Sequence, residues 1–506
     1  MTGEFYGGIG EIVALRLRED PGRIFISEPE TGRTLTFGEL ARSVSDTAGA
    51  LSQKGFRKRD MVALSFHNSI EAAIAFLGVV SAGGIALPLN PNGVKREMEF
   101  PLDDSGARFL LSASSAPIKA DMFSDFKSSE IGNGLTLHTL PPAERERREE
   151  IPEDMALLLY TSGTTGLPKG VVLTHRNLTC ECRNIAGAHA LSKDDRALCL
   201  LPVHHINGLV VTLLTPLYAG CEVVMPPKFS AGSFWKWVQL GVTWFSAVPT
   251  IFSILLSRTS ETEAAGSNLR FARSASAPLP EATLSEFENR FGVPVIESYG
   301  ISEGCSQITS NPLPPAPHKP GSAGIPFGNE VKIFNGDGSE AAEGTIGEVA
   351  VKGENISPGY FRNPDATTKS FRGAWFFTGD LGRFDKDGYL FLHGRKKELI
   401  NRAGEMISPR EIDEIMYSFP GVESAASVGV PHAFYGEEVI AFVRPREGVS
   451  IHEDEIRKFC ADKLADFKIP KRIYSVDDFP KGPSGKIQRR KLAEIYMALP
   501  ESEKLP

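Results

Sequence analysis

Hydrophobic residues alternate between two spacings in the first part of the chain. Residues 36–56 place them at helical intervals, and Thr36 and Glu39 stand at the spacing of a capping box. Residues 60–90 then predict a strand, a second helix and a second strand. Strands that alternate with helices favour a mostly parallel sheet covered by helices. The pattern therefore predicts an α/β fold.

The pattern changes after residue 310. Residues 311–324 are rich in Pro and Gly and predict a loop. Residues 331–353 then read as short strands joined by tight turns, which favours an antiparallel β-rich portion.

A second change, near residues 394–398, begins a smaller unit. Two helices are predicted in it, with capping boxes formed by Ser408 with Glu411 and by Ser450 with Glu453. Strands lie between these helices, so we expect a small α+β unit that follows a large α/β one. The predicted domains are residues 1–395 and residues 396–506.

The composition argues against several classes of protein. At 506 residues the chain is too long for one compact core. Its net charge of −8 argues against nucleic-acid binding, which needs clustered Lys and Arg. The six cysteines lack the pattern of a disulfide framework or a zinc finger. Neither a signal peptide nor a membrane-spanning apolar run is visible, so we expect a cytoplasmic protein without membrane insertion.

Residues 160–170, YTSGTTGLPKG, combine glycines, hydroxyl side chains and one lysine between apolar flanks. Glycines let backbone N–H groups converge on anionic oxygens, hydroxyls add donors, and Lys169 adds a positive charge. The string favours phosphate binding, although alone it also fits a plain turn. It is not a Walker loop, because Lys169 is followed by Gly170 and not by Ser or Thr.

This loop is followed by further motifs in residues 297–304, 375–413 and 480–492. Together, and in this order, they resemble the acyl-adenylate-forming superfamily: acyl- and aryl-CoA synthetases, peptide-synthetase adenylation domains and beetle luciferases. The resemblance spans nearly the whole chain. It implies a large N-terminal domain and a small, mobile α+β C-terminal domain.

The resemblance implies an AMP-forming acid–thiol ligase of the acyl-CoA synthetase branch. A carboxylic acid would attack the α-phosphate of ATP to give acyl-AMP and pyrophosphate, and the acyl group would then pass to coenzyme A. ATP, Mg²⁺ and coenzyme A are thus implied. A carrier-protein phosphopantetheine is an alternative acceptor, and either a monomer or a homodimer is compatible. A binding protein that has lost catalysis is disfavoured, because the motif residues Lys169, Glu303, Asp380, Arg395 and Lys486 are all present.

The resemblance also assigns roles to individual residues. Glu303 would bind Mg²⁺, Ser302 would touch the α-phosphate, and Lys486 would bridge this phosphate and the acid. Asp380 would accept the ribose hydroxyls and Tyr299 would stack on adenine. The phosphates of ATP would lie against Thr161, Ser162, Gly163, Thr164, Thr165, Gly166 and Lys169. Further nucleotide contacts would come from Ser276, Ala277, Pro278, Glu297, Ser298, Gly300 and Arg395.

The resemblance further implies that the small domain rotates about Lys397. One orientation would present Lys486 for adenylation. The other would present the loop that contains Gly404, which leaves room for the pantetheine thiol.

The acyl site is implied less specifically. His205 matches the family's pocket histidine, and a metal at His204–His205 is disfavoured. Amino-acid-activating relatives carry an aspartate at the start of the segment that corresponds to residues 201–211, where it pairs the amine; this chain has none there, so an α-amino acid is disfavoured. Malonate-activating relatives carry an arginine where this chain has Ser298, so malonate is disfavoured as well. Residues 269–279 are similar to oxalate–CoA ligases, but aliphatic and aromatic acids stay open. The site would be completed by Asn207, Gly208, Pro249, Ser274, Ala275 and Ile301.

Overall fold

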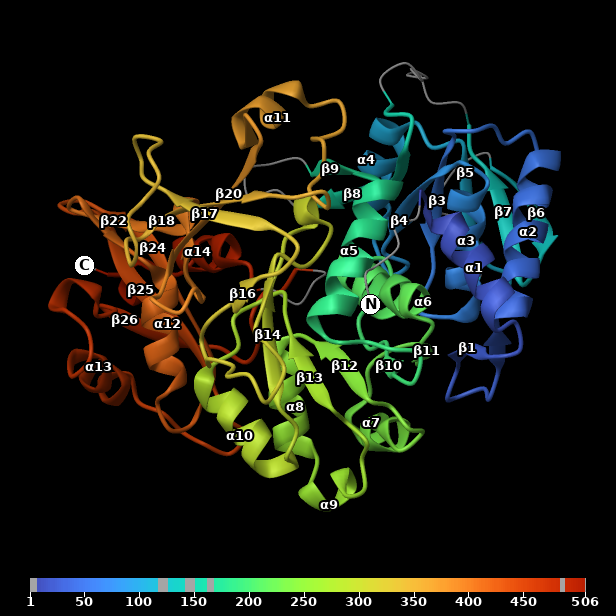
Figure 1. Cartoon of the computed structure of the whole chain (residues 1–506). Coiled ribbons are helices and arrows are strands. Elements are labelled where there is room, and N and C mark those ends of the chain that lie inside the picture. Colours follow the sequence, from blue (N-terminus) through green and yellow to red (C-terminus); the bar gives the residue numbers. More distant parts are fainter. Residues whose placement is uncertain (1–6, 117–125, 142–150, 162–167, 483–486, 506) are drawn as a thin grey trace.

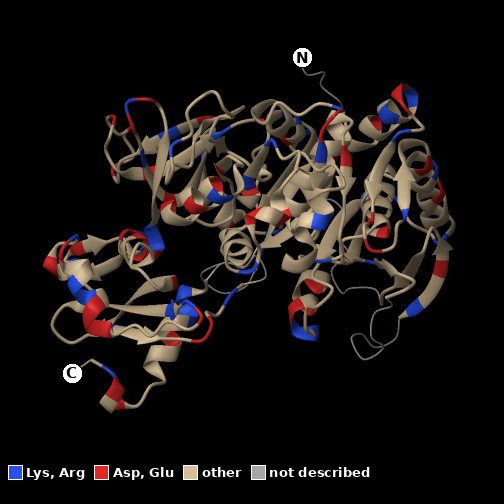
Figure 2. Cartoon of the chain, turned by 90° about the horizontal axis from the view of Figure 1, so that it is seen from below, with Lys and Arg blue, Asp and Glu red and all other residues tan. Residues whose placement is uncertain are grey.

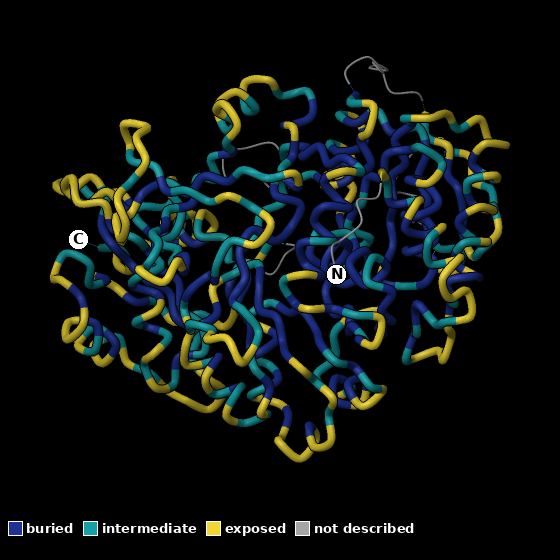
Figure 3. Tube along the Cα trace, in the orientation of Figure 1, coloured by how far each residue is buried: buried dark blue, intermediate teal, exposed yellow. Residues whose placement is uncertain are grey.

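A computed structural model describes residues 7–116, 126–141, 151–161, 168–482 and 487–505. Within these ranges the strands form four sheets, with helices between and around them (Figure 1). Buried residues concentrate in the middle of the large N-terminal part, and exposed ones mark the loops at the rim (Figure 3). The predicted α/β fold class, with a β-rich portion and an α+β C-terminal part, is confirmed.

The first sheet has a parallel centre and antiparallel edges, in the order β6-β7-β5-β3-β4-β8-β9. Strand β3 pairs in parallel with β4 and β5, and β4 pairs in parallel with β8. The strand–helix–strand prediction for residues 60–90 is confirmed by β3, α3 and β4. The strands are β3 (Met61–Ser65), β4 (Ile85–Leu89), β5 (Phe109–Ala113), β6 (Lys127–Gly132), β7 (Leu135–Thr139), β8 (Met155–Thr161) and β9 (Lys169–Thr174).

Helix α2 (Phe37–Gln53) begins at the predicted capping box. Glu39 N donates to Thr36 Oγ1 at 3.2 Å, and Thr36 N donates to Glu39 Oε2 at 2.8 Å. Two N–H groups that the helix leaves unpaired are thereby satisfied. The other helices of this part are α1 (Ile9–Glu19), α3 (Ile70–Ser81) and α4 (Lys95–Ser105).

The second sheet has the order β16-β15-β14-β13-β12-β10-β11-β1-β2 and is parallel from β1 to β14. Its strands are β1 (Ile24–Ser27), β2 (Thr34–Thr36), β10 (Arg196–Leu198), β11 (Glu222–Val224), β12 (Trp244–Ala247), β13 (Phe271–Ser274), β14 (Val295–Tyr299), β15 (Thr309–Ser310) and β16 (Ile325–Pro326).

The two faces of this sheet pack against different helices. One face contributes Trp244 and Phe271 to the main core, together with residues of α5 (His175–Ala188), the π-helix η2 (Asn207–Leu214) and α6 (Thr215–Ala219). Helices α5 and α6 thus lie between the two sheets (Figure 1). The opposite face packs in a second core against α7 (Ala231–Val238), α8 (Pro249–Arg258), α9 (Glu261–Ala264) and α10 (Glu281–Phe291).

The remaining two sheets follow in the chain. The β-rich portion confirms the antiparallel prediction, because β17 pairs with β18 and β18 with β20 in antiparallel fashion. Its elements are β17 (Glu330–Phe334), β18 (Gly347–Lys352), α11 (Pro364–Ser370), β19 (Phe371–Arg372), β20 (Trp375–Phe384) and β21 (Leu390–Arg395). The C-terminal elements are β22 (Ile400–Arg402), β23 (Glu405–Ile407), α12 (Pro409–Tyr417), β24 (Val422–His432), β25 (Gly436–Pro445), α13 (Glu453–Ala461), β26 (Arg472–Ser475) and α14 (Arg489–Met497).

Both predicted capping boxes of the C-terminal part were wrong in detail. Helix α12 begins at Pro409 as predicted, but the Ser408 hydroxyl donates to the carbonyl of His393 instead of capping the helix. Glu411 pairs with Lys468 at 2.8 Å. The side chains of Ser408 and Glu411, which the sequence pattern predicted to form the cap, therefore bind residues that are distant in the sequence.

Helix α13 begins at Glu453, three residues after the predicted cap Ser450. His452 holds the N-cap position, and its N–H donates to Glu455 at 3.3 Å. The Glu453 carboxylate instead accepts from the N–H of Ile473 on β26, at 3.1 Å. The sequence placed the helix correctly but not its first residue.

Residues of both charge signs are interspersed along the ribbon (Figure 2). In the described ranges, each helix is too short or too polar to cross a membrane.

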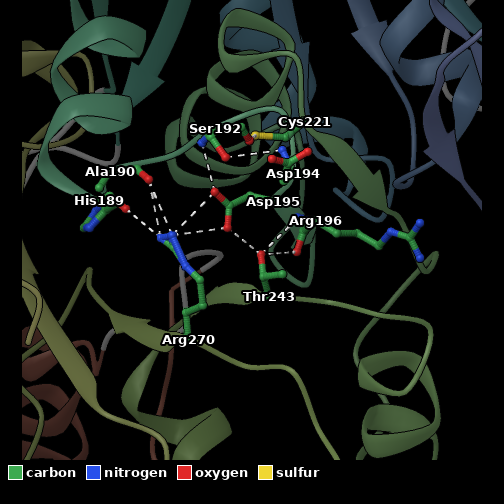
Figure 4. A network of polar contacts seen from close by, with 9 residues as sticks. All are labelled: His189, Ala190, Ser192, Asp194, Asp195, Arg196, Cys221, Thr243 and Arg270. Carbon is green, nitrogen blue, oxygen red and sulfur yellow. Dashed lines mark hydrogen bonds and ion pairs between the residues drawn. The ribbon is translucent and has the colours of Figure 1, made fainter. Parts of the chain in front are cut away.

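Asp195 ties together the starts of three strands of the second sheet (Figure 4). Its carboxylate accepts from Thr243 Oγ1 at 2.8 Å and from Ser192 N at 2.9 Å, and it pairs with Arg270 at 3.3 Å. Arg270 also donates to the carbonyl of His189 at 3.1 Å. Because Asp195 is buried, these donors offset the cost of its desolvation.

His189 ends helix α5 inside the main core. Its ring stacks on Phe271 with centroids 5.1 Å apart, and Nε2 lies 3.1 Å from Gln307 Oε1. Burial lowers the pKa of His189 from 6.5 to about 3. The folded protein therefore holds a neutral imidazole that the unfolded chain would protonate below pH 6.5.

We expect this histidine to make the protein acid-sensitive. Between pH 6.5 and pH 3 the unfolded chain binds a proton that the folded protein excludes, so stability falls as the pH is lowered through this window. At pH 5 the loss is about 2 kcal/mol. In His189→Gln, the drop in thermal unfolding midpoint between pH 7 and pH 5 should be smaller than in the wild type. An equal drop in both proteins would contradict this assignment.

Candidate active site

The predicted phosphate loop connects two antiparallel strands. Thr161 at the end of β8 pairs with Lys169 at the start of β9, and Thr161 Oγ1 donates to the Lys169 carbonyl at 3.4 Å. The hairpin places both ends of the loop side by side. Ser162, Gly163, Thr164, Thr165 and Gly166 lie outside the described residues.

Lys169 and Glu303 meet at Tyr360, which the sequence analysis missed. The Tyr360 hydroxyl donates to Glu303 Oε1 at 2.7 Å, and Lys169 Nζ lies 4.7 Å from the centre of the Tyr360 ring. Burial and the Glu303 carboxylate raise the pKa of Tyr360, so its hydroxyl stays protonated and donates. A cation over the face of a ring and a carboxylate on its hydroxyl are both favourable contacts. Tyr360 therefore fixes the lysine and the carboxylate at one place.

A tight turn after β14 carries the next predicted residues. A side chain at Gly300 would place its Cβ 1.4 Å from the Ser306 carbonyl oxygen, so only glycine fits. Ser302 and Glu303 then open the short 3₁₀-helix η3 (Ser302–Gly304). The close approach at Gly300 directs this helix across the carboxyl end of β14, where Glu303 reaches Tyr360.

Asp380 is held from two directions. Tyr299 OH donates to Asp380 Oδ2 at 2.6 Å, and Arg395 Nε lies 2.9 Å from Asp380 Oδ1. Asp380 and Arg395 are direct partners across the β20–β21 hairpin, whereas Tyr299 ends β14 of the second sheet. Asp380 raises the pKa of Arg395, with a smaller contribution from Glu303, so the arginine lies within electrostatic range of both carboxylates. Burial raises the pKa of Tyr299 well above its usual range, which keeps it a hydrogen-bond donor.

Glu297 is another predicted nucleotide contact. This buried carboxylate accepts from Gly321 N at 2.9 Å, and burial raises its pKa to about 7. Next to it, the Ser298 hydroxyl lies 2.9 Å from that of Ser310. Ser276 has a φ of 74°, which is uncommon for a residue other than glycine. Ala277 and Pro278 follow it, and Pro278 is exposed.

The predicted acyl side begins at the N-terminal end of η2. Asn207 is buried, and its Nδ2 lies 3.3 Å from Ser276 Oγ. A Cβ at Gly208 would lie 2.2 Å from the Pro202 carbonyl oxygen, so η2 packs closely on the segment before it. The rings of His204 and His205 lie 4.4 Å apart, and burial lowers the pKa of His204 to about 3.

The remaining predicted acyl-site residues are near the end of β13. Side chains alternate along a strand, so Ala275 continues the face of Phe271, whereas Ser274 continues the face of Ala272. The first of these faces is the one that packs toward η2. Ile301 packs against both this main core and the β-rich portion.

The C-terminal residues with predicted roles are not placed against this site. Lys486 lies outside the described residues, and Lys481 and Ile487 on either side of it form an isolated β-bridge. Lys397 is exposed in the 3₁₀-helix η4 (Lys396–Glu398). Gly404 is exposed with a φ of 94°. Their roles stay predictions.

The comparisons with known proteins agree with this arrangement. The sequence profile of the AMP-binding enzyme family matches residues 14–361, and that of the AMP-binding enzyme C-terminal domain matches residues 411–486. The chain belongs to the AMP-binding enzymes. The resemblance inferred from the motifs is confirmed.

Two relatives extend over nearly the whole chain. An oxalate–CoA ligase of Arabidopsis thaliana is 42% identical over 92% of this chain and 94% of its own length. A sulfoacetate–CoA ligase of Cupriavidus necator is 38% identical over 97% of this chain and 98% of its own. As predicted, the chain is an acid–thiol ligase, which forms an acyl-AMP and transfers the acyl group to coenzyme A.

The fold also matches a solved structure, ATP-bound MatB from Rhodopseudomonas palustris. The TM-score is 0.86 at 31% identity, over 97% of this chain and 99% of that one. The apo structure of the same protein, at the same identity and coverage, gives a TM-score of 0.76.

The contacts of Tyr360 generate a prediction. Tyr360→Phe keeps the ring under Lys169 but removes the donor to Glu303, so ATP-dependent pyrophosphate release should fall roughly 10-fold. Tyr389 offers a matched control, because its hydroxyl donates to Pro317 and its ring lies 4.3 Å from Lys319 Nζ. Tyr389→Phe should leave the rate unchanged, and equal rates in both variants would contradict the role of Tyr360.

Proposed function

We propose that this acid–thiol ligase acts on a small acid that carries a second anionic group, with oxalate as the simplest example. The observation that carries the proposal is the buried carboxamide of Asn207 at the acyl side, which makes this wall polar. One N–H of this group faces Ser276, and an alkyl or aryl chain would leave the other without an acceptor, at a cost of about 1–3 kcal/mol. The two relatives named for oxalate and sulfoacetate support the same class of acid.

The geometry supports a division of roles in ATP binding. Lys169 and the loop before it would hold the β- and γ-phosphates, and Asp380 would accept the ribose hydroxyls beside Arg395. Tyr299 would stack on adenine. Fixed cations and donors of this kind stabilise the charge that develops on the transferring phosphate.

Glu303 fits the predicted Mg²⁺ role. Mg²⁺ prefers oxygen ligands and usually takes one or two carboxylates together with substrate phosphates. Tyr360 holds one carboxylate oxygen of Glu303, which orients the other. The ion would neutralise phosphate charge when bound. Lys169 lies over the same tyrosine ring, so both positive charges would meet the same phosphates.

The proposed reaction has two steps. A carboxylate oxygen of the acid attacks the α-phosphorus, the bond to the β-phosphate breaks, and pyrophosphate leaves. Ser302 and Lys486 would stabilise the charge on the α-phosphate, and His205 would line the acyl side. In the second step the thiol of coenzyme A attacks the acyl carbon, and AMP leaves.

Domain rotation about Lys397 would separate the two steps. The better match to the ATP-bound than to the apo structure of MatB supports the view that the described arrangement corresponds to the adenylation step. The positions of Lys397 in an exposed 3₁₀-helix and of Gly404 in an exposed loop are compatible with such a motion.

A panel of acids tests this function. We expect pyrophosphate release with oxalate or sulfoacetate to exceed that with acetate and benzoate, and acyl-CoA to form when coenzyme A is added. ADP as the product would contradict the reaction, and a preference for benzoate would contradict the substrate class. Transfer only to a phosphopantetheinyl carrier protein would replace coenzyme A as the acceptor.

The two-step scheme makes Lys486 specific to the first step. Lys486→Ala should slow acyl-AMP formation by at least roughly 10²-fold, as expected when a donor to the transition state is removed. Thioester formation from supplied acyl-AMP should be nearly unchanged.

Gly404→Leu serves as the reciprocal variant. It should leave pyrophosphate release nearly unchanged and slow thioester formation, because the side chain would fill the predicted thiol path. Equal losses in both steps for either variant would contradict the rotation scheme.

A further inference from the structure

An arginine lies buried beneath the predicted acyl site. Arg273 on β13 is 1% exposed, and its strand partner on β12 is Ser246, which is fully buried. Arg273 Nη1 donates to Ser246 Oγ at 3.0 Å, and Nε donates to Gln307 Oε1 at 3.2 Å. Burial lowers the pKa of Arg273 to about 10, so the side chain stays charged at neutral pH. A buried cation that donates to neutral acceptors requires an explanation.

The arginine dictates the direction of a chain of hydrogen bonds. A guanidinium has only donors, so Ser246 Oγ must accept from Arg273. The single hydroxyl proton of Ser246 is then available for Asn207 Oδ1, which lies 3.0 Å away. With its oxygen facing Ser246, Asn207 must point its NH₂ group toward Ser276, at 3.3 Å. Arg273 therefore determines the orientation of the Asn207 carboxamide through two successive hydrogen bonds.

The base of this chain is fixed by buried groups. Gln307 Oε1 accepts from Arg273 and lies 3.1 Å from His189 Nε2, and the backbone N–H of Gln307 donates to Glu181 at 2.5 Å. Glu181 is fully buried and also accepts from Asn355 Nδ2 at 2.9 Å. Its carboxyl group acts to raise the pKa of Arg273, against the larger effect of burial. Arg273 is thereby held under the acyl side.

We propose that Arg273, acting through Ser246, is a positioning residue that sets acid specificity: it fixes the Asn207 carboxamide so that its N–H groups hydrogen-bond a second anionic group on the acid. One N–H of Asn207 faces Ser276, and the acid would meet the other. The inference deepens the proposed function and rests on it.

Physical chemistry favours a dianionic acid at such a wall. The donor chain begins at a buried positive charge, and hydrogen bonds in a poorly polarisable interior reinforce one another. An acid that ends in a methyl group leaves the second N–H of Asn207 unpaired, and sites built to hydrogen-bond a substrate reject analogues that lack the acceptor. If Asn207 were free to turn, its oxygen would face the acid and repel a carboxylate.

Ser246→Ala tests the relay directly. It removes one oxygen atom and frees the carboxamide, so kcat/KM for oxalate should fall roughly 10-fold while kcat/KM for acetate stays within about 2-fold. Most of the loss should be in KM for the acid, with KM for ATP unchanged. Ser112→Ala is the matched control, because Ser112 is also fully buried in a strand, with its hydroxyl 2.9 Å from His138 Nε2 in the first sheet. It should leave the oxalate-to-acetate ratio unchanged.

Two further variants separate positioning from general structure. Arg273→Lys keeps a cation and a donor and should retain more of the oxalate preference than Arg273→Met. Asn207→Asp should lower kcat/KM for oxalate by roughly 10²-fold or more, because like charges would face each other. Thermal unfolding of each variant shows whether it remains folded.

The outcomes are distinct. If the wild type prefers oxalate and Ser246→Ala preserves that preference, the inference is wrong and the proposed substrate class stands. Equal losses for oxalate and acetate in Ser246→Ala would also overturn it, as the signature of a structural defect. If the wild type releases pyrophosphate but favours acetate over every dianionic acid tested, the substrate class and the inference both fail.

Discussion

The contact among Tyr299, Asp380 and Arg395 joins the second sheet to the β-rich portion. Tyr299 ends a strand of the second sheet, whereas Asp380 and Arg395 face each other across a hairpin of the β-rich portion. A carboxylate with a tyrosine hydroxyl on one oxygen and a guanidinium on the other has little freedom to turn. The position of the predicted ribose site thus depends on two sheets being held in register.

Tyr360 joins different sheets at the predicted phosphate site. It forms an isolated bridge with Val171 on β9, so it belongs to the edge of the first sheet as well as to the segment before α11. Its hydroxyl reaches Glu303, which follows the second sheet. The residues predicted to bind the nucleotide therefore lie where three sheets converge, and each sheet supplies some of them. Such convergence explains why the motifs are far apart in the sequence.

The predicted acyl side differs from the nucleotide side in where its charged group lies. Among the residues predicted to bind the nucleotide, Asp380 pairs directly with Arg395, and Glu303 and Lys169 both contact Tyr360. At the predicted acyl side the cation is buried: Arg273 donates to Ser246, and Ser246 donates to the neutral carboxamide of Asn207. A cation placed directly in the site would bind an anion strongly but would also attract phosphate. In the proposed arrangement, a buried cation orients the amide dipole of Asn207. This dipole would bind an anion less strongly than a cation would, and it would select the acid by the direction of its hydrogen bonds.

The sequence by itself determined the elements and the reaction class. The periodicity of residues 36–90, the capping box of Thr36 with Glu39 and the strands of residues 331–353 are local, because each depends on residues a few positions apart. The motifs identified the family for a similar reason, because each is a contiguous string of residues that can be compared with the family directly.

Only the tertiary structure decided which side chains meet. Ser408 and Glu453 have good local uses as caps, but His393 and Ile473 approach them and take their hydrogen bonds. Tyr360 had no local signal, and the segment of Arg273 was noted only for its similarity to oxalate–CoA ligases, because the partners of both residues are distant in the sequence. Strand order and register fix those partners, and no spacing along the chain encodes them. The sequence therefore determined the reaction class, and packing decided the hydrogen bonds that connect Arg273, Ser246 and Asn207.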